Sequence, residues 1–246
     1  MLGLPSQVTA CLFDLDGVLT QTALVHNAAW KQTFDAFLQS WAEQHGQPYV
    51  PFDPAADYHR YVDGRQRADG VRTFLASRGI LLPEGDPDDT PDRETVNGIG
   101  KSKNLLVLEK IKEGAVQVYP GSVEYLKAAH AAGLRRAVVS ASANCKDVLE
   151  AAGIADLLEA RVDGVVAREL GLPGKPAPDT FLKGAELLGL DPANCAVFED
   201  AQAGVAAGRA GGFGIVIGVD RVGQAEALRE HGADVVVTDL SELLTQ

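Results

Sequence analysis

The sequence predicts an α/β protein in which helices cover a parallel sheet and a helical domain is inserted after the first strand. Beyond Pro120, short apolar runs alternate with helical segments that end at glycines, a pattern typical of parallel sheets. Between residues 23 and 112 this alternation is missing and helical spacing prevails. We therefore expect an α/β core of residues 1–22 and 113–246. Residues 23–112 would form a helical domain of about 90 residues, a usual domain size.

Composition narrows the class of protein. The 246 residues are 46% hydrophobic and 23% charged, as in a soluble globular protein with a real core. The formal net charge of −12 argues against nucleic acid or an anionic membrane as partner, because both require a basic face. Cys11, Cys145 and Cys195 lack metal-ligand spacing and are expected to be reduced. Without a signal sequence or long apolar span, the cytoplasm is the expected location. We also expect a monomer.

The first strand is expected at residues 8–13, and the inserted domain follows it. Apolar residues at helical spacing predict a helix at 23–44. A second helical stretch at 58–78 contains glycines that predict interruptions at Asp63-Gly64 and at Gly70. Residues 83–92 read as a polar acidic loop, and 104–113 as a short helix.

The core alternates more regularly, with glycines such as Gly133, Gly153 and Gly189 ending its helices. Asp179 is the expected N-terminal cap of one of them. Strands are expected at 135–140, 161–166, 195–198, 213–217 and 235–237, and helices at 123–132, 146–152, 179–188, 201–210, 225–230 and 240–244.

Two aspartates end the first strand. Asp14 and Asp16 are two positions apart, so both can face one site where the strand is still extended. Gly17 then lets the chain turn sharply. Two carboxylates this close repel unless a cation or proton lies between them, and Mg²⁺ prefers carboxylates with water and substrate phosphate. The alternative is an ordinary polar turn, since Asp and Gly are common turn residues.

Ligands of open parallel sheets lie beyond the carboxyl ends of the strands, where further polar residues are expected. Glu199 and Asp200 follow a later strand. With Asp14 and Asp16, these two acids suit one Mg²⁺. Asp14 and Asp200 are the preferred ligands, together with a main-chain carbonyl near Asp16. Glu199 would have a supporting role. Alone, Glu199-Asp200 would read as a helix start, because acids favour a first helical turn.

The remaining polar groups at this edge can hold a phosphoryl group. The Ser140 hydroxyl and the N–H groups that follow it can bind phosphate oxygens, although Ser142 and Asn144 equally fit an N-cap. Lys175, between Gly174 and Pro176, would supply a cation, although such a lysine is commonly a solvated loop charge. A carboxylate can attack phosphorus and form an aspartyl phosphate. We expect Asp14 to be this nucleophile and Asp16 the general acid and base.

Asp14-x-Asp16-Gly17, Ser140, Lys175-Pro176 and Glu199-Asp200 occur in the order of the four motifs of the haloacid dehalogenase superfamily, which the chain resembles over nearly its whole length. Within it, the chain is similar to the β-phosphoglucomutase family. The residues that carry this closer resemblance are Asp16 to Thr20, Thr22, His26, Trp30, Gly64-x-x-Arg67, Ser140-Ala141-Ser142-x-Asn144, Lys175 to Asp179 and Glu199 to Gly204.

This resemblance implies a Rossmann-like core with a helical cap, Mg²⁺ as cofactor and a small phosphorylated sugar as substrate. It implies interconversion of β-D-glucose 1-phosphate and glucose 6-phosphate through a bisphosphate; the alternative is a sugar-phosphate phosphatase of the same superfamily. A non-enzymatic binder is a third class, and the intact Asp14, Asp16, Lys175 and Asp200 count against it. Ser140, Ala141, Ser142, Asn144 and Lys175 would hold the phosphate at the core.

Residues of the cap receive roles by the same resemblance. Thr22 would lie at the hinge, His26 near the acid/base, and Gly64 with Arg67 at the distal phosphate of the substrate. A partly buried helical His26 fits the sequence equally well. Without the resemblance, Arg65 and Arg67 read as solvated charges and Lys103 as a surface lysine. The chain departs from its relatives at Gln21, at Gly70 and in the acidic loop 83–92, which leaves the sugar specificity open.

Overall fold

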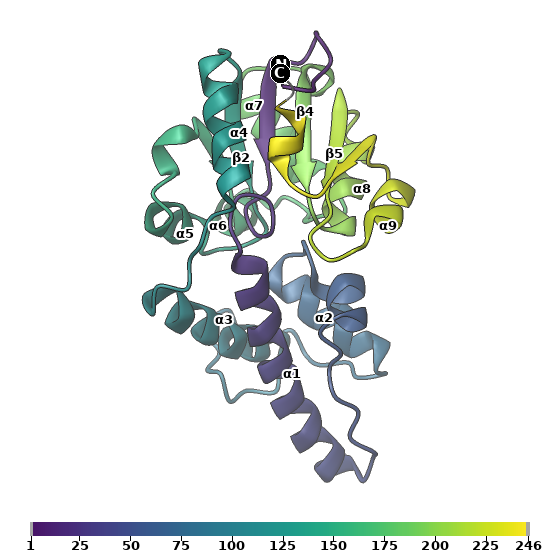
Figure 1. Ribbon diagram of the computed structural model, residues 1–246. Helices are drawn as coiled ribbons and strands as arrows, with labels where there is room; N and C mark the ends of the chain where they lie inside the picture. Colours follow the sequence, from purple (N-terminus) through teal and green to yellow (C-terminus); the bar gives the residue numbers. More distant parts are fainter. Residues whose placement is uncertain (1, 245–246) are drawn as a thin grey trace. The chain divides into compact units, whose positions relative to one another are not determined.

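The computed structural model describes residues 2–244, whose chain divides into two compact units (Figure 1). The first, the core unit, combines Met1–Thr22 with Val116–Gln246, and the second, the helical unit, is Ala23–Ala115. Within residues 2–244, no helix has the length and apolarity needed to cross a bilayer. All three cysteines are buried, and none forms a disulfide.

The core unit contains a six-stranded sheet in the order β3-β2-β1-β4-β5-β6, and every strand pair is parallel. In the centre, Phe13 is in register with Val138 on one side and with Phe198 on the other. The carboxyl ends of the central strands therefore meet at one edge, and the predicted fold class is confirmed. The strands are β1 (Ala10–Phe13), β2 (Arg135–Val139), β3 (Ala160–Val162), β4 (Cys195–Glu199), β5 (Ile215–Val219) and β6 (Val235–Val237).

Helices cover both faces of the sheet, as the alternating sequence predicts (Figure 1). They are α4 (Pro120–Ala131), α5 (Cys145–Ala151), α6 (Gly164–Glu169), α7 (Asp179–Leu187), α8 (Gln202–Ala210) and α9 (Ala225–Glu230), with short 3₁₀ turns at Ala155–Leu157, Pro192–Asn194 and Leu240–Leu243.

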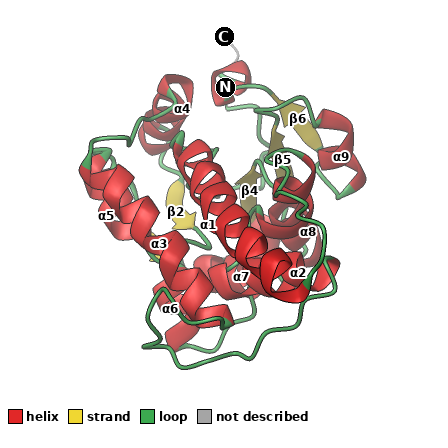
Figure 2. Cartoon of the chain, turned by 90° about the horizontal axis from the view of Figure 1, so that it is seen from below, coloured by secondary structure: helices red, strands yellow, loops and turns green. Residues whose placement is uncertain are grey.

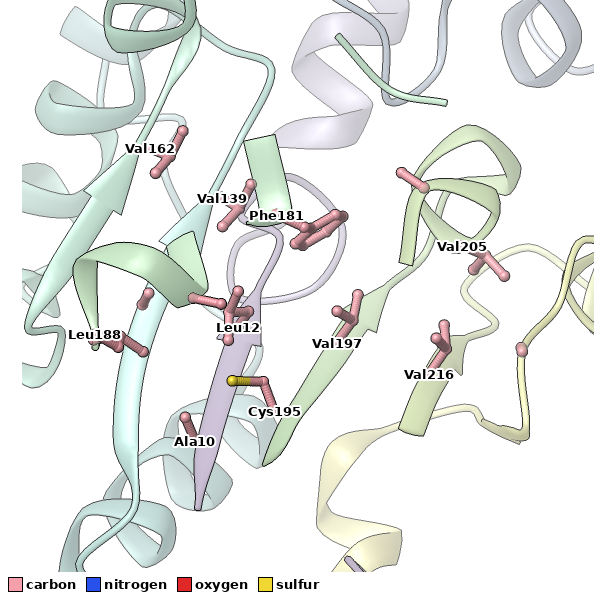
Figure 3. Close-up of a cluster of buried hydrophobic side chains, with 14 of the residues drawn as sticks. Ala10, Leu12, Val139, Val162, Phe181, Leu188, Cys195, Val197, Val205 and Val216 are labelled. Atoms are coloured by element: carbon pink, nitrogen blue, oxygen red, sulfur yellow. The ribbon is translucent and has the colours of Figure 1, made fainter. Parts of the chain in front are cut away.

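The central strands are apolar on both faces because both are covered. On one face, Leu12, Val139 and Val197 pack with Phe181 of α7 in a fully buried cluster (Figure 3). On the other face, Phe13 stacks on Phe198 with ring centroids 4.6 Å apart. Burial of each such side chain stabilises the fold by about 1.5–3 kcal/mol. The strand ends that carry the acids are thus held on a rigid, close-packed support.

The described residues of the helical unit form helices and loops around their own apolar core (Figure 2). Phe34 and Phe74 lie at its centre, with ring centroids 4.2 Å apart. The helices are α1 (Thr22–His45), a π-helical turn at Tyr58–Val62, α2 (Arg67–Ser77) and α3 (Val96–Lys112).

Several element predictions were wrong in detail. The expected strand 161–166 ends at Val162, because the Asp163 carboxylate accepts bonds from Val165 and Val166 and starts α6. Gly70 does not interrupt α2 but is buried inside it. α3 starts at Val96 rather than at 104, since the Thr95 side chain accepts a bond from Gly98. Asp179 is the first helical residue of α7 and Pro178 occupies the cap position.

Candidate active site

The turn after β1 is tightly closed. The Asp14 N–H donates to the Phe198 carbonyl at 2.9 Å, and the Gly17 N–H donates to the Thr20 carbonyl at 2.7 Å. Gly17 has a φ of +95°, which favours glycine. A Cβ there would lie 1.7 Å from Oδ2 of Asp200, so any side chain would displace this carboxylate. Gly17 thus permits both the turn and the close approach of the two acid-bearing segments.

Lys175 is a buried cation between two carboxylates. Its Nζ atom lies 2.6 Å from Oδ1 of Asp14, 2.5 Å from Oε1 of Glu199 and 3.0 Å from the Val139 carbonyl. Its side chain is only 1% exposed, so the alternative of a solvated loop charge is wrong. Burial lowers the pKa of Lys175, but Asp14 and Glu199 outweigh burial and raise that pKa overall.

Three carboxylates gather beside this lysine. Asp14, Glu199 and Asp200 each offer one oxygen, and these oxygens lie within 4.8 Å of one another. All three residues are buried. Burial raises the pKa of Asp14 well above its usual value; Lys175 opposes the shift, and Glu199 and Asp16 add to it. A cation would relieve the cost of keeping these acids ionised together.

The donor set fits Mg²⁺, which takes hard oxygen ligands and few carboxylates. The Glu199 carboxylate is held by bonds at both oxygens: Oε1 accepts from Lys175, and Oε2 accepts from the Ala201 N–H at 3.0 Å. Gly204 of α8 leaves room for it, since a Cβ there would lie 1.8 Å from Oε1. Glu199 is thus oriented by Lys175 and the start of α8, while Asp200 lies against Gly17.

Asp16 is held by hydroxyl groups. The Thr22 hydroxyl donates to Oδ1 of Asp16, and the Ser140 hydroxyl donates to Oδ2 at 3.4 Å. Thr22 also shares a 2.6 Å bond with the hydroxyl of Thr20. The sequence assigned Thr22 only to the hinge, and the contact with Asp16 was not foreseen.

The loop after β2 folds around its own hydroxyl groups. Oγ of Ser140 accepts from the Ser142 N–H at 3.0 Å, and Oγ of Ser142 accepts from the Asn144 N–H at 3.2 Å. Asn144 occupies the cap position of α5, but its side chain makes no cap bond there. Gly164 packs against this loop, and a Cβ there would lie 2.6 Å from the Ala141 carbonyl oxygen. The predicted phosphate-binding segment is therefore compact and supported.

The predicted cap residues lie in the helical unit. Nζ of Lys103 lies 2.7 Å from Nδ1 of His26 and 4.9 Å from the ring centroid of Trp30. Lys103 is only 5% exposed, so its interpretation as a surface lysine is wrong.

The predicted distal-phosphate segment starts α2. Gly64 has a φ of +68°, Arg65 is half-buried, and Arg67 is the first residue of α2. A Cβ on Gly100 would lie 3.3 Å from Cγ of Arg67, so this glycine of α3 leaves room for the arginine stem.

Two residues that contact the turns of this site were missed. Arg221 donates to the Gly17 carbonyl at 2.9 Å, and Gln224 donates to the Asp200 carbonyl at 2.9 Å. Both follow β5, and a general search for polar residues after each strand would have marked the segment, although no motif does.

This arrangement is of the phosphoryl-transfer type: acids follow β1 and β4 of a parallel sheet, and a buried lysine lies beside them. Comparison with known proteins identifies the family. Residues 8–212 match the family model described as haloacid dehalogenase-like hydrolase. The chain belongs to the haloacid dehalogenase-like hydrolase family, and the predicted resemblance is confirmed.

Individual relatives cover nearly the whole chain. It is 58% identical over 247 residues to a β-phosphoglucomutase of Mycobacterium bovis, covering 99% of this chain and 94% of that protein. It is 30% identical over 232 residues to hexitol phosphatase A of Escherichia coli, covering 94% and 91%. The crystal structure of β-phosphoglucomutase from Clostridium difficile has a TM-score of 0.74 and 26% identity, covering 96% and 93%.

Proposed function

We propose that this enzyme interconverts β-D-glucose 1-phosphate and glucose 6-phosphate by phosphoryl transfer through an aspartyl phosphate. The observation that carries the choice of reaction is the 58% identity to a β-phosphoglucomutase over nearly the full length of both chains. The geometry supports the chemistry, because Asp14 and Asp16 lie with a buried lysine at one edge of the sheet.

Asp14 is the nucleophile in this proposal. Its carboxylate oxygen attacks the phosphorus of the sugar bisphosphate, an aspartyl P–O bond forms, and the bond to the sugar oxygen breaks. The Lys175 ammonium, 2.6 Å from Oδ1, holds this carboxylate in place. The same ammonium lies where it can offset charge on the phosphoryl oxygens.

Asp16 is the general acid and base. As an acid it gives its proton to the departing sugar oxygen, and as a base it takes the proton of the next attacking hydroxyl. Bonds from Thr22 and Ser140 orient both of its oxygens. The hydroxyl and N–H groups of Ser140, Ala141, Ser142 and Asn144 would hold the phosphate oxygens with Lys175.

Asp14, Asp200 and the main-chain carbonyl of Asp16 would hold Mg²⁺, with Glu199 in support. When bound, Mg²⁺ supplies positive charge that offsets the charge of the transferring phosphoryl group. The protein contributes the orientation: Lys175 and Ala201 fix Glu199, and Gly17 admits Asp200. This arrangement accounts for three buried acids in one place.

The helical unit supplies the second half of the proposal. A mutase holds its sugar by a second phosphate, and Arg67 is the proposed cation for it, because guanidinium binds phosphate bidentately. Gly64, Arg65, His26 and Lys103 are assigned to the same region of substrate binding, and Thr22 to the hinge. Exclusion of water would then direct the phosphoryl group to a sugar hydroxyl. A monomer acting in the cytoplasm on a small phosphorylated sugar completes the proposal.

The test is a ³¹P NMR time course with β-glucose 1-phosphate, Mg²⁺ and a trace of glucose 1,6-bisphosphate. We expect glucose 6-phosphate to accumulate as the substrate disappears. α-Glucose 1-phosphate is the matched control and should remain unchanged. Release of inorganic phosphate as fast as the sugar phosphate is consumed would instead identify a phosphatase.

A further inference from the structure

The loop Asp220–Gln224, between β5 and α9, contacts both turns that carry the proposed catalytic and metal-binding acids. The loop is rigid because of its first residue. The Asp220 carboxylate accepts four main-chain bonds, from the N–H groups of Val222, Gly223, Gln224 and Ala225, at 2.7–3.1 Å. Its side chains therefore project from a fixed base.

Arg221 reaches the turn that carries Asp16. Its Nε atom donates to the Gly17 carbonyl at 2.9 Å, and Nη2 donates to the Val18 carbonyl at 3.4 Å. The guanidinium lies over the Tyr119 ring, with Cζ 3.6 Å from the ring centroid. Only 13% of the side chain is exposed. A guanidinium presents several donors in a fixed plane, which a lysine cannot reproduce.

The other end of the same guanidinium is anchored in the core unit. Nη1 donates to the Thr238 carbonyl at 2.7 Å and to Oδ2 of Asp239 at 3.2 Å, and Nη2 donates to Oγ of Ser122 at 3.3 Å. Arg221 thus ties the Asp16 turn to two further segments of the core.

Gln224 reaches the turn that carries Asp200. Its Nε2 atom donates to the Asp200 carbonyl at 2.9 Å, and its Oε1 atom accepts from the Gln202 side chain at 3.1 Å. The two turns also touch each other, because Asp200 Oδ2 lies where a Gly17 Cβ would be. The two turns are therefore adjacent, and each has its own hydrogen bond from the loop Asp220–Gln224.

We infer that Arg221 and Gln224 are positioning residues of the phosphoryl-transfer site: Arg221 holds the Asp16 turn for proton transfer, and Gln224 holds the Asp200 turn for the divalent cation. This inference rests on the proposed function for the roles of the two acids. Neither side chain touches a proposed reacting atom; both act on the main chain that presents the acids. Because Arg221 and Gln224 make separate hydrogen bonds, we expect loss of Arg221 to affect mainly turnover and loss of Gln224 to affect mainly binding of the divalent cation.

The experiment compares Gln224→Met and Arg221→Lys, with Gln39→Met in α1 and Arg209→Lys in α8 as matched controls on exposed side chains. Binding of Mn²⁺, a spin-visible substitute for Mg²⁺, is measured by electron paramagnetic resonance without substrate. Gln224→Met should raise the Mn²⁺ Kd about three- to tenfold, the effect of one lost bond to a buried group. Arg221→Lys should lower kcat for sugar conversion about tenfold or more, with the Mn²⁺ Kd changed less than in Gln224→Met.

Gly208→Ala tests whether reduced stability of the fold alone weakens Mn²⁺ binding. Its Cβ would lie 3.1 Å from the side chains of Val197 and Val216, which belong to neither turn. If this variant, folded but less stable, weakens Mn²⁺ binding as much as Gln224→Met does, the inference is overturned. It is also overturned if Gln224→Met binds Mn²⁺ like wild type, or if Arg221→Lys turns over like wild type. The wild type could bind Mn²⁺ and hydrolyse an aryl phosphate but convert no glucose phosphate. That result would refute the proposed function and leave this inference standing. Aryl phosphate hydrolysis would then replace the sugar assay for Arg221→Lys.

Discussion

Nζ of Lys175 lies 2.5 Å from Oε1 of Glu199, so this carboxylate is already paired with a cation of the protein itself. Its other oxygen accepts from Ala201. Asp200 presses instead against the turn at Gly17. Glu199 and Asp200 therefore make different contacts, although they are adjacent in the sequence.

This difference predicts an order of metal affinities. Glu199→Gln should raise the Mg²⁺ Kd about tenfold, as expected for a residue that supports the ligands. Asp200→Ala should raise it further, because it removes a proposed ligand. Isothermal titration calorimetry with MgCl₂ measures both. Weaker binding in Glu199→Gln than in Asp200→Ala would reverse the assignment of ligand and support.

Gly204→Ala should disrupt the site from within α8. Its Cβ would lie 1.8 Å from Oε1 of Glu199, so the carboxylate must leave Lys175. We expect kcat/KM to fall at least about tenfold, the effect of a lost charge-assisted bond. Gly208→Ala is the control, since it adds the same methyl group to the same helix, where the nearest atoms belong to the side chains of Val197 and Val216. Equal activity losses in the two variants would show that the effect comes from packing.

Much of this site could be predicted because the carboxyl ends of parallel strands meet at one edge. That rule alone brought Asp14, Ser140 and Glu199 into one prediction. It did not predict that Lys175 bridges Asp14 and Glu199, because Lys175 lies in a loop rather than at a strand end, and the rule does not place loops.

Other features are not marked by any motif in the sequence. Arg221 and Gln224 bind main-chain carbonyls, which every residue possesses, so their partners leave no mark in the sequence. The segment 161–166 was wrongly predicted as one strand, although Asp163 and Gly164 separate its valines; the strand ends at Val162, and the Asp163 side chain caps α6.

Asp220 predicts a pH-dependent contribution to stability. Burial raises its pKa, but the N–H groups of Gln224, Val222, Gly223 and Ala225 together outweigh burial and hold the pKa below the ordinary 3.8. A lowered folded-state pKa means that the stabilisation is present above that ordinary value and is lost as pH falls through the folded-state pKa. Asp220→Asn should therefore cost about 1 kcal/mol in unfolding free energy at neutral pH.

Urea unfolding of wild type and Asp220→Asn measures this contribution. The difference between them should shrink as the pH falls below the ordinary pKa of 3.8. A difference that stays constant through this acid range would show that the Asp220 charge contributes nothing.

Arg67→Ala separates transfer to sugar from phosphate release. If its guanidinium binds the distal phosphate, its loss should reduce sugar turnover roughly ten- to hundredfold, equivalent to about 1.5–3 kcal/mol. Hydrolysis of p-nitrophenyl phosphate, which has no second phosphate, should change little. Steady-state kinetics on both substrates provide the comparison. Wild-type behaviour on both would remove Arg67 from the substrate site.

The most direct test of the account is the fate of the phosphoryl group on Asp14. Wild type is labelled with ³²P-glucose 1,6-bisphosphate, freed of substrate, and mixed with β-glucose 1-phosphate or with buffer alone. Asp14→Asn is the control and should take up no label. We expect the label on wild type, located at Asp14 by mass spectrometry, to pass mainly to sugar phosphate when the sugar is added. Label that appears as inorganic phosphate at the same rate with and without the sugar would contradict it.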